Sequence, residues 1–242
     1  MFIGNKHRAL AWVPAIDYHG AGMVQGSRGV ARQKSRGEAM DPQARKVEIL
    51  NSAARCFMEK GYHATSIDDV ARALGCTKGF IYHYYASKTD LFFDVHREGM
   101  DRLFAAVMPA TQAVGGPLAV LIAMLTAHAR AMMDHHAFET VVAQGVQIHR
   151  FGATTPDQRR TLDELIASRD RFEDLFKDQA HAARAVGQIV ADDISIAVKM
   201  MLGALQWSIF WYRPEADDGP DARDRLAARM VTTIIDGVRA RN

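Results

Sequence analysis

Apolar side chains recur at helical spacing along residues 66–85. In the first half of this stretch they occupy positions i, i+3, i+4 and i+7, which is typical of a short helix with one buried face: Ile67, Val70, Ala71 and Leu74. Thr65 or Ser66 can cap the start of this helix, and an aspartate three residues later would close a capping box. Gly75 stands where a helix end needs a left-handed residue. The pattern predicts a helix that stops at a tight turn.

A second short helix is predicted directly after that turn. Thr77 can cap it, and Ile81 and Tyr85 stand four residues apart on its buried side. The residues left facing outward are small, basic, aromatic or able to form hydrogen bonds: Thr77, Lys78, Gly79, Tyr82 and His83. A helix-turn-helix presents such residues at the start of its second helix, where they reach base edges and phosphates in the major groove. We therefore interpret this stretch as a DNA-reading unit.

Helical patterns account for most of the remaining chain, so we expect an all-α fold. The pair Asp41-Pro42 opens a helix that runs to Lys60, and the run from Ser87 to Asp90 is a second capping box that opens a helix to about Met108. Further segments with helical periodicity cover residues 118–134, 137–150, 157–186, 193–212 and 221–240. No stretch has the alternation of a convincing strand.

This order of elements indicates three parts. Residues 1–40 are punctuated by glycine and rich in basic side chains, and we interpret them as a tail, either a basic arm that follows DNA or a leader without a role. Residues 41–90 form a three-helix DNA-binding head with the helix-turn-helix. Residues 91–242 form a helical domain for effector binding and dimerisation. Its helix at 193–212 is apolar nearly all round, which predicts an internal pocket on one side and a partner on the other.

Composition limits the other possibilities. The formal net charge of +2 is too small to argue for nucleic-acid binding by itself, so any basic surface must be local. Two cysteines make no disulfide framework and suit a reducing cytoplasm. The stretch 194–212 approaches the length of a membrane span, but Lys199 near its middle favours a helix of a soluble domain. We expect a cytoplasmic, nucleoid-associated protein without a membrane partner and without a signal peptide.

The sequence makes no positive case for catalysis. It contains no nucleophile elbow, phosphate-binding loop or dinucleotide-binding glycine cluster. Histidines of the second half of the chain lack the spacing of a zinc hydrolase: His128, His135, His136, His149 and His181. We therefore predict no catalytic residue, no metal site and no cofactor.

Aromatic residues near the end of the 193–212 helix raise the possibility of a small-molecule site. Trp207 and Trp211 cluster there, and Phe172 stands on the preceding helix beside Arg171. An apolar cavity with a few convergent polar groups is how such sites are built, and an arginine would suit a carboxylate or phosphate. The alternative is a plain hydrophobic core with surface arginines. We name Arg171, Phe172, Trp207 and Trp211 as the candidate ligand-binding residues.

The run from Gly61 to Leu91 closely resembles the DNA-binding signature of the TetR family of transcriptional repressors, including the spacing of Tyr82, Tyr85 and Lys88. Tyr85 is a departure, since the family usually has phenylalanine there. The resemblance implies that Lys88 contacts a phosphate, and we expect Thr65 to do so on the other side of the recognition surface. It also implies a homodimer formed through the last two helices, which would suit a palindromic operator in double-stranded DNA.

A shorter run, from Ile194 to Pro214, looks like the C-terminal segment of TetR-type regulators of fatty-acid, aromatic-acid and steroid catabolism. That resemblance implies an acyl-CoA thioester as the effector. The function we expect is a sequence-specific repressor that a small molecule releases from DNA. Two alternatives remain from the residues alone: a helical enzyme acting on a CoA or lipid substrate, and a non-specific nucleoid protein.

Overall fold

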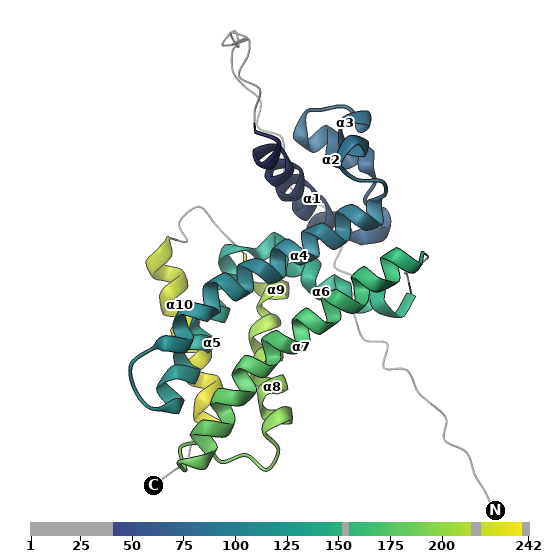
Figure 1. Ribbon diagram of the computed structural model, residues 1–242. Coiled ribbons are helices and arrows are strands. Elements are labelled where there is room, and N and C mark those ends of the chain that lie inside the picture. The colour runs from purple at the N-terminus through teal and green to yellow at the C-terminus, as the bar shows by residue number, and fades with distance from the viewer. Residues whose placement is uncertain (1–40, 152–154, 214–218, 239–242) are drawn as a thin grey trace, which may run out of the picture. The chain divides into compact units, whose positions relative to one another are not determined.

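The computed structural model describes residues 41–151, 155–213 and 219–238. Within these residues every regular element is a helix, as expected for an all-α protein (Figure 1). The predicted tail, residues 1–40, lies outside the described residues. The elements are α1 (Pro42–Ala64), α2 (Ile67–Leu74), α3 (Lys78–Tyr84), α4 (Lys88–Val107), the 3-10 helix η1 (Met108–Gln112), α5 (Pro117–Asp134), α6 (His136–Phe151), α7 (Pro156–Ala185), α8 (Ile194–Gln206), α9 (Ser208–Trp211) and α10 (Pro220–Asp236).

Local capping explains where the first helices begin. The side chain of Asp41 accepts a hydrogen bond from the Gln43 amide, and Pro42 occupies the first turn of α1. At Gly61 the backbone turns left-handed, with φ of 75°, so the regular part of α1 ends there. The side chain of Ser87 accepts from the Asp90 amide and starts α4. These boundaries lie where the sequence places them.

Buried apolar side chains form two clusters, and α4 contributes to both. The first joins α1, α2 and α3 to the start of α4 and includes Phe57 and Phe92, whose rings meet edge to face at 5.2 Å. It also takes in Phe138 and Val141 of α6 and Leu162 and Leu165 of α7. The second cluster joins the end of α4 to α5, α7, α8 and α10. The division at residue 90 stays a prediction, because α4 and its neighbours pack across it.

The apolar stretch near the C-terminus differs in one respect from the expected single helix. α8 ends at Gln206, and after Trp207 the chain continues as the short helix α9. By length and composition alone Ile194–Trp211 could cross a membrane, and a third of this window is buried. Its inner side, which includes Val198 and Leu205, packs into the second cluster. Its outer side stays open, and it carries Ile196, Met200, Trp207, Phe210 and Trp211.

Candidate nucleic-acid interface and effector cavity

Two linked caps fix α2 and α3. Ser66 starts α2, its hydroxyl accepts from the Asp69 amide at 3.1 Å, and the Asp69 carboxylate accepts from the Ser66 amide at 2.9 Å. Gly75 then takes the left-handed conformation, with φ of 71°, and closes the helix. The hydroxyl of Thr77 accepts from the Phe80 amide and starts α3. The turn between the helices is thereby held on both sides.

Helix α3 is anchored by its inner face and exposes its outer face. Ile81 is fully buried, and Tyr85, at the end of α3, is 4% exposed. Tyr85 carries a hydroxyl that phenylalanine at this position would not have. This hydroxyl donates to Asp94 at 3.3 Å, so it has a hydrogen-bond partner. The outward residues are those that the sequence pattern predicts: Thr77, Lys78, Gly79, Tyr82 and His83. Side chains in this position can enter a major groove without disturbing the packing behind them.

Lys88 has partners inside the protein that the sequence pattern did not predict. Its ammonium group donates to three main-chain carbonyls at the end of α1, those of Tyr62 at 2.7 Å, His63 at 3.2 Å and Thr65 at 2.8 Å. The ammonium also lies 4.5 Å from the centre of the Tyr62 ring. These carbonyls lack helical partners because α1 breaks at Gly61. Lys88 therefore closes the end of α1 in the DNA-free protein, and its contact with a phosphate stays a prediction.

Thr65 also has its partners inside the protein. It is 1% exposed, and its hydroxyl lies 2.7 Å from the Gly61 carbonyl oxygen and 3.0 Å from that of Cys56. A hydroxyl has one proton to donate, and here it faces two acceptors inside the protein. Thr65 thus stabilises the break between α1 and α2, and its side chain is buried in the DNA-free protein.

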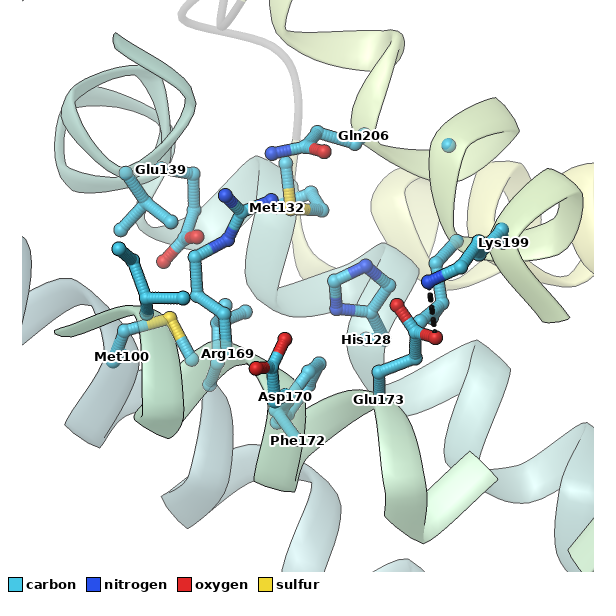
Figure 2. A pocket seen from close by; sticks show the side chains of 15 residues that line it. Met100, His128, Met132, Glu139, Arg169, Asp170, Phe172, Glu173, Lys199 and Gln206 are labelled. Atoms are coloured by element: carbon cyan, nitrogen blue, oxygen red, sulfur yellow. Dashed lines mark hydrogen bonds and ion pairs between the residues drawn. The ribbon is translucent and has the colours of Figure 1, made fainter. Parts of the chain in front are cut away.

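A cavity of about 350 Å³ lies among α4, α5, α6, α7 and α8 (Figure 2). The predicted ligand residue Phe172 lines it and packs edge to face on Phe104 at 5.2 Å. The full lining comprises Met100, Leu103, His128, Met132, Glu139, Val142, Ile166, Arg169, Asp170, Phe172, Glu173, Lys199, Leu202, Gly203 and Gln206. This combination of methionine and aromatic surface with a few polar groups is typical of a small-molecule site.

Three of the four predicted ligand residues do not line this cavity. Arg171 is exposed on α7, and Arg169, two positions earlier, lines the cavity instead. Trp207 and Trp211 are 62% and 46% exposed on the outer side of α8 and α9. The sequence pattern missed Glu139, His128 and Lys199. A signal was present for Glu139, because it interrupts the apolar run formed by Phe138, Val141 and Val142.

Burial sets the charge of the polar groups in the cavity. It raises the pKa of Glu139 well above the usual range, and Arg102 opposes this only in part. The same effect lowers the pKa of His128 to about 4. Burial thus favours the neutral form of both side chains. Arg169 keeps its charge, although burial lowers its pKa.

No metal centre is evident in the part of the chain that the structure describes. Within residues 41–151, 155–213 and 219–238, no three His, Cys, Asp or Glu side chains are grouped to hold a metal ion. His128 contacts the rings of Phe172 and Phe176. His136 lies 3.0 Å from the carbonyl oxygen of Ile209. Both histidines have packing roles.

The chain is similar to known regulators over most of its length. It is 26% identical over 196 residues to the HTH-type transcriptional repressor KstR2 of Mycobacterium tuberculosis, covering 81% of this chain and 93% of that protein. The crystal structure of the TetR family transcriptional regulator PfmR from Thermus thermophilus matches with a TM-score of 0.65 and 31% identity, over 78% of this chain and 97% of that one. AibR, solved in complex with isovaleryl coenzyme A and operator DNA, matches with a TM-score of 0.62 and 26% identity, over 78% and 97% of the two chains.

Two family descriptions cover both clusters of the fold. Residues 49–95 match "Bacterial regulatory proteins, tetR family", and residues 114–238 match "Tetracyclin repressor-like, C-terminal domain". The first match contains the helix-turn-helix, and the second contains four of the five helices around the cavity. The chain therefore belongs to the TetR family of bacterial regulatory proteins, which control transcription and are not enzymes.

Proposed function

We propose that this protein is a repressor that binds a palindromic operator as a homodimer and leaves it when a small molecule occupies the cavity. The observation that carries the proposal is the outer face of α3. Five of the seven predicted DNA-binding residues, all except Thr65 and Lys88, are exposed there. Ile81 and Tyr85 on the opposite side are buried and anchor the helix. Tyr82 is 46% exposed, so its ring and hydroxyl are accessible to a base edge.

The recognition surface combines groups for both parts of a DNA contact. Lys78 supplies a cation for phosphate, which gives affinity that falls as salt rises. Tyr82, His83 and Thr77 supply hydrogen bonds and apolar contact for base edges. Gly79 adds no side chain, and nothing lies within 4 Å of where a β carbon would stand, so α3 can approach the groove closely. The protein would act on the nucleoid, in the cytoplasm.

An apolar surface supports the homodimer. Ile196, Met200, Trp207, Phe210 and Trp211 are between 46% and 69% exposed on α8 and α9. Soluble monomers seldom leave a contiguous patch of this kind in water. A two-fold interface would bury the patch against its own copy, and it would set the two heads at a spacing that matches a palindrome. One head alone would read too few bases for useful specificity.

The effector we propose is an acyl-CoA thioester. The AibR structure, which holds isovaleryl coenzyme A and operator DNA, supports this chemistry for a protein of similar fold. A cavity of about 350 Å³ lies near the lower end of the volumes of ligand sites, roughly 300–1,000 Å³. The acyl part would fill it, and the nucleotide would stay near its opening. Lys199, half exposed at the cavity, is placed to meet a phosphate.

Helix α4 offers the route from cavity to DNA. Met100 and Leu103 line the cavity, while Leu91, Phe92 and Val95 of the same helix pack under the head. A ligand that fits one orientation of α4 better than another shifts the balance between them by the difference in its affinities. Release from DNA requires that the α4 orientation favoured by the ligand hold the two heads at a spacing that does not fit the operator.

The test is a selection of operator sequences from random DNA, followed by fluorescence anisotropy with the selected duplex. We expect a palindrome, and we expect Tyr82→Ala and Lys78→Ala to lose operator binding while Arg171→Ala, an exposed control on α7, keeps it. Isovaleryl-CoA and longer acyl-CoA thioesters should release the wild-type protein. Binding without sequence preference would indicate the non-specific nucleoid protein instead. Specific binding that no thioester relieves would remove only the effector assignment.

A further inference from the structure

Three polar groups of the cavity have no partner among the residues that the structure describes. Glu139 is 1% exposed and its Oε1 atom has no hydrogen-bond partner. The Nδ1 atom of buried His128 has none either. The half-buried guanidinium of Arg169 makes no ion pair or hydrogen bond with any residue that the structure describes. Figure 2 shows the side chains of Arg169 and Glu139 turned toward the same part of the cavity.

The neighbouring carboxylates do not answer this need. Glu173 is held by Lys177 at 2.7 Å and by Lys199 at 2.5 Å. Asp170 is exposed, and both Asp170 and Glu173 support the charge of Arg169 only through space, without a hydrogen bond or ion pair. Burial raises the pKa of Glu139 and so favours its neutral form. The guanidinium of Arg169 is thus left at the wall of the cavity with one positive charge and no anion bound to it.

Such an arrangement is unfavourable in the empty protein. A buried polar group without a hydrogen bond costs free energy, and a partly buried charge without a partner costs more. Protonated Glu139 has one hydrogen to donate, and Arg169 has several. Around them lie the apolar side chains of Met100, Val142 and Met132. The cavity therefore offers donors at one place and flexible apolar surface around it.

We propose that the cavity binds an amphipathic carboxylic acid, with its carboxylate on Arg169 and an acceptor oxygen on Glu139. This rests on the proposed function, in which the cavity is the effector site. A single charge suits one guanidinium, whereas a phosphate dianion would bring a second charge beside buried Glu139. Two kinds of molecule share this chemistry: a free carboxylic acid, and the thioester of a dicarboxylic acid whose second carboxylate remains free.

The experiment measures thermal shifts of the DNA-free protein with four matched probes. Octanoate and suberyl-CoA carry a carboxylate at the end of an eight-carbon chain, while octanol and octanoyl-CoA carry none there. We expect a carboxylate probe to bind the wild-type protein at least about tenfold more tightly than its neutral counterpart, the usual effect of a hydrogen-bonded charge. Octanoate as the stronger probe would identify a free acid, and suberyl-CoA would identify a diacid thioester.

Variants of two neighbouring arginines locate the contact. Arg169→Gln should lose the preference for the carboxylate, Arg169→Lys should keep part of it, and Arg171→Gln, on the exposed side of α7, should keep all of it. Equal shifts from charged and neutral probes, no shift from either carboxylate, or an unchanged preference in Arg169→Gln would each overturn the proposal.

The ligand-free melting temperature gives a second, independent measurement. Because Arg169 has no partner in the described part of the chain, Arg169→Gln should melt no lower than Arg171→Gln in the absence of ligand. A clearly lower value would show that Arg169 is already satisfied inside the protein, and it would overturn the proposal. A measurement of operator binding tests the repressor function separately from the carboxylate site. Loss of the carboxylate preference leaves the repressor intact, and absence of any operator leaves the carboxylate site intact.

Discussion

Lys78 Nζ lies 2.9 Å from Asp68 Oδ2, so the basic residue of the recognition helix is paired with a carboxylate of α2 in the free protein. Both side chains are about half exposed, at 50% and 52%. The hydrogen bond to Asp68 raises the pKa of Lys78, which keeps the ammonium charged. Exposed ion pairs are weak, so a DNA phosphate can replace Asp68 at little cost.

Removing this competitor should strengthen DNA binding. We expect Asp68→Asn to raise operator affinity by about two- to tenfold, since an acidic group near the phosphates is lost and Lys78 is freed. The measurement is anisotropy at several salt concentrations. Asp163→Asn, an exposed aspartate of α7, is the control for net charge. Equal gains in both variants would show a general charge effect rather than release of Lys78.

Lys88 should matter first for stability. Lys88→Met removes three hydrogen bonds to carbonyls at the end of α1, and we expect it to lower the free energy of unfolding by about 1–3 kcal/mol. Chemical denaturation of the DNA-free protein measures this. Lys46→Met, which removes a lysine of 41% side-chain exposure that is paired with Asp94, should cost less. A variant of unchanged stability with weak operator binding would support a phosphate role for Lys88.

Glu139 predicts a particular dependence on pH. As pH rises, the unfolded chain loses the Glu139 proton at a lower pH than the folded protein does. Rising pH therefore lowers the free energy of unfolding. The wild-type protein therefore loses stability from this group as pH rises above about 4.5 toward the raised pKa. Glu139→Gln, which cannot ionise, should gain in melting temperature relative to wild type between pH 5 and pH 8. A constant difference across this range would contradict the neutral carboxyl group.

His96 and His128 predict the opposite dependence. Burial lowers the pKa of each to about 4, with Arg169 and Arg97 adding to the effect at His96. Between pH 6.5 and pH 4 the unfolded chain takes up protons that the folded protein refuses, so stability falls as pH falls. Each group should contribute a loss of about 2 kcal/mol at pH 5. His128→Gln should show a smaller decrease in melting temperature between pH 7 and pH 5 than wild type, whatever its stability at pH 7.

Helices α4 and α6 make a close contact at Gly145, which has no side chain. A β carbon on Gly145 would collide with Cδ2 of His96, whose ring is buried and cannot move aside. Gly145→Ala should therefore destabilise the protein by about 1–3 kcal/mol. His96→Ala makes room for the added methyl group, so the double variant should be more stable than the sum of the single effects predicts. Additive losses would show that the two positions do not press on each other.

The helix boundaries of the head were predictable because they depend on near neighbours. Ser66 with Asp69, Thr77 and Gly75 act through atoms three or four residues away, and their patterns can be seen in the sequence. The outward face of α3 follows from the same short range. Periodicity places Ile81 and Tyr85 inside, and the recognition residues must then point outward.

The positions whose surroundings the sequence did not predict depend on distant parts of the chain. Lys88 meets carbonyls 23 to 26 residues away, which no local pattern reveals. Arg169 and Arg171 have the same chemistry, and only the packing of α7 against α4, α5 and α8 decides which one faces the cavity. Trp207 and Trp211 look like core residues by composition, yet they lie on the side of α8 and α9 that a single chain leaves open.

The cluster beneath the head has a consequence for protein engineering. Phe138, Val141, Leu162 and Leu165 come from α6 and α7, yet they pack with the side chains of the DNA-reading helices. A chimera that replaces the head at residue 90 with that of another regulator would bring together apolar surfaces that do not pack closely. Exchange of operator specificity would succeed only if these four side chains travel with the head, or if the change is confined to the outer face of α3.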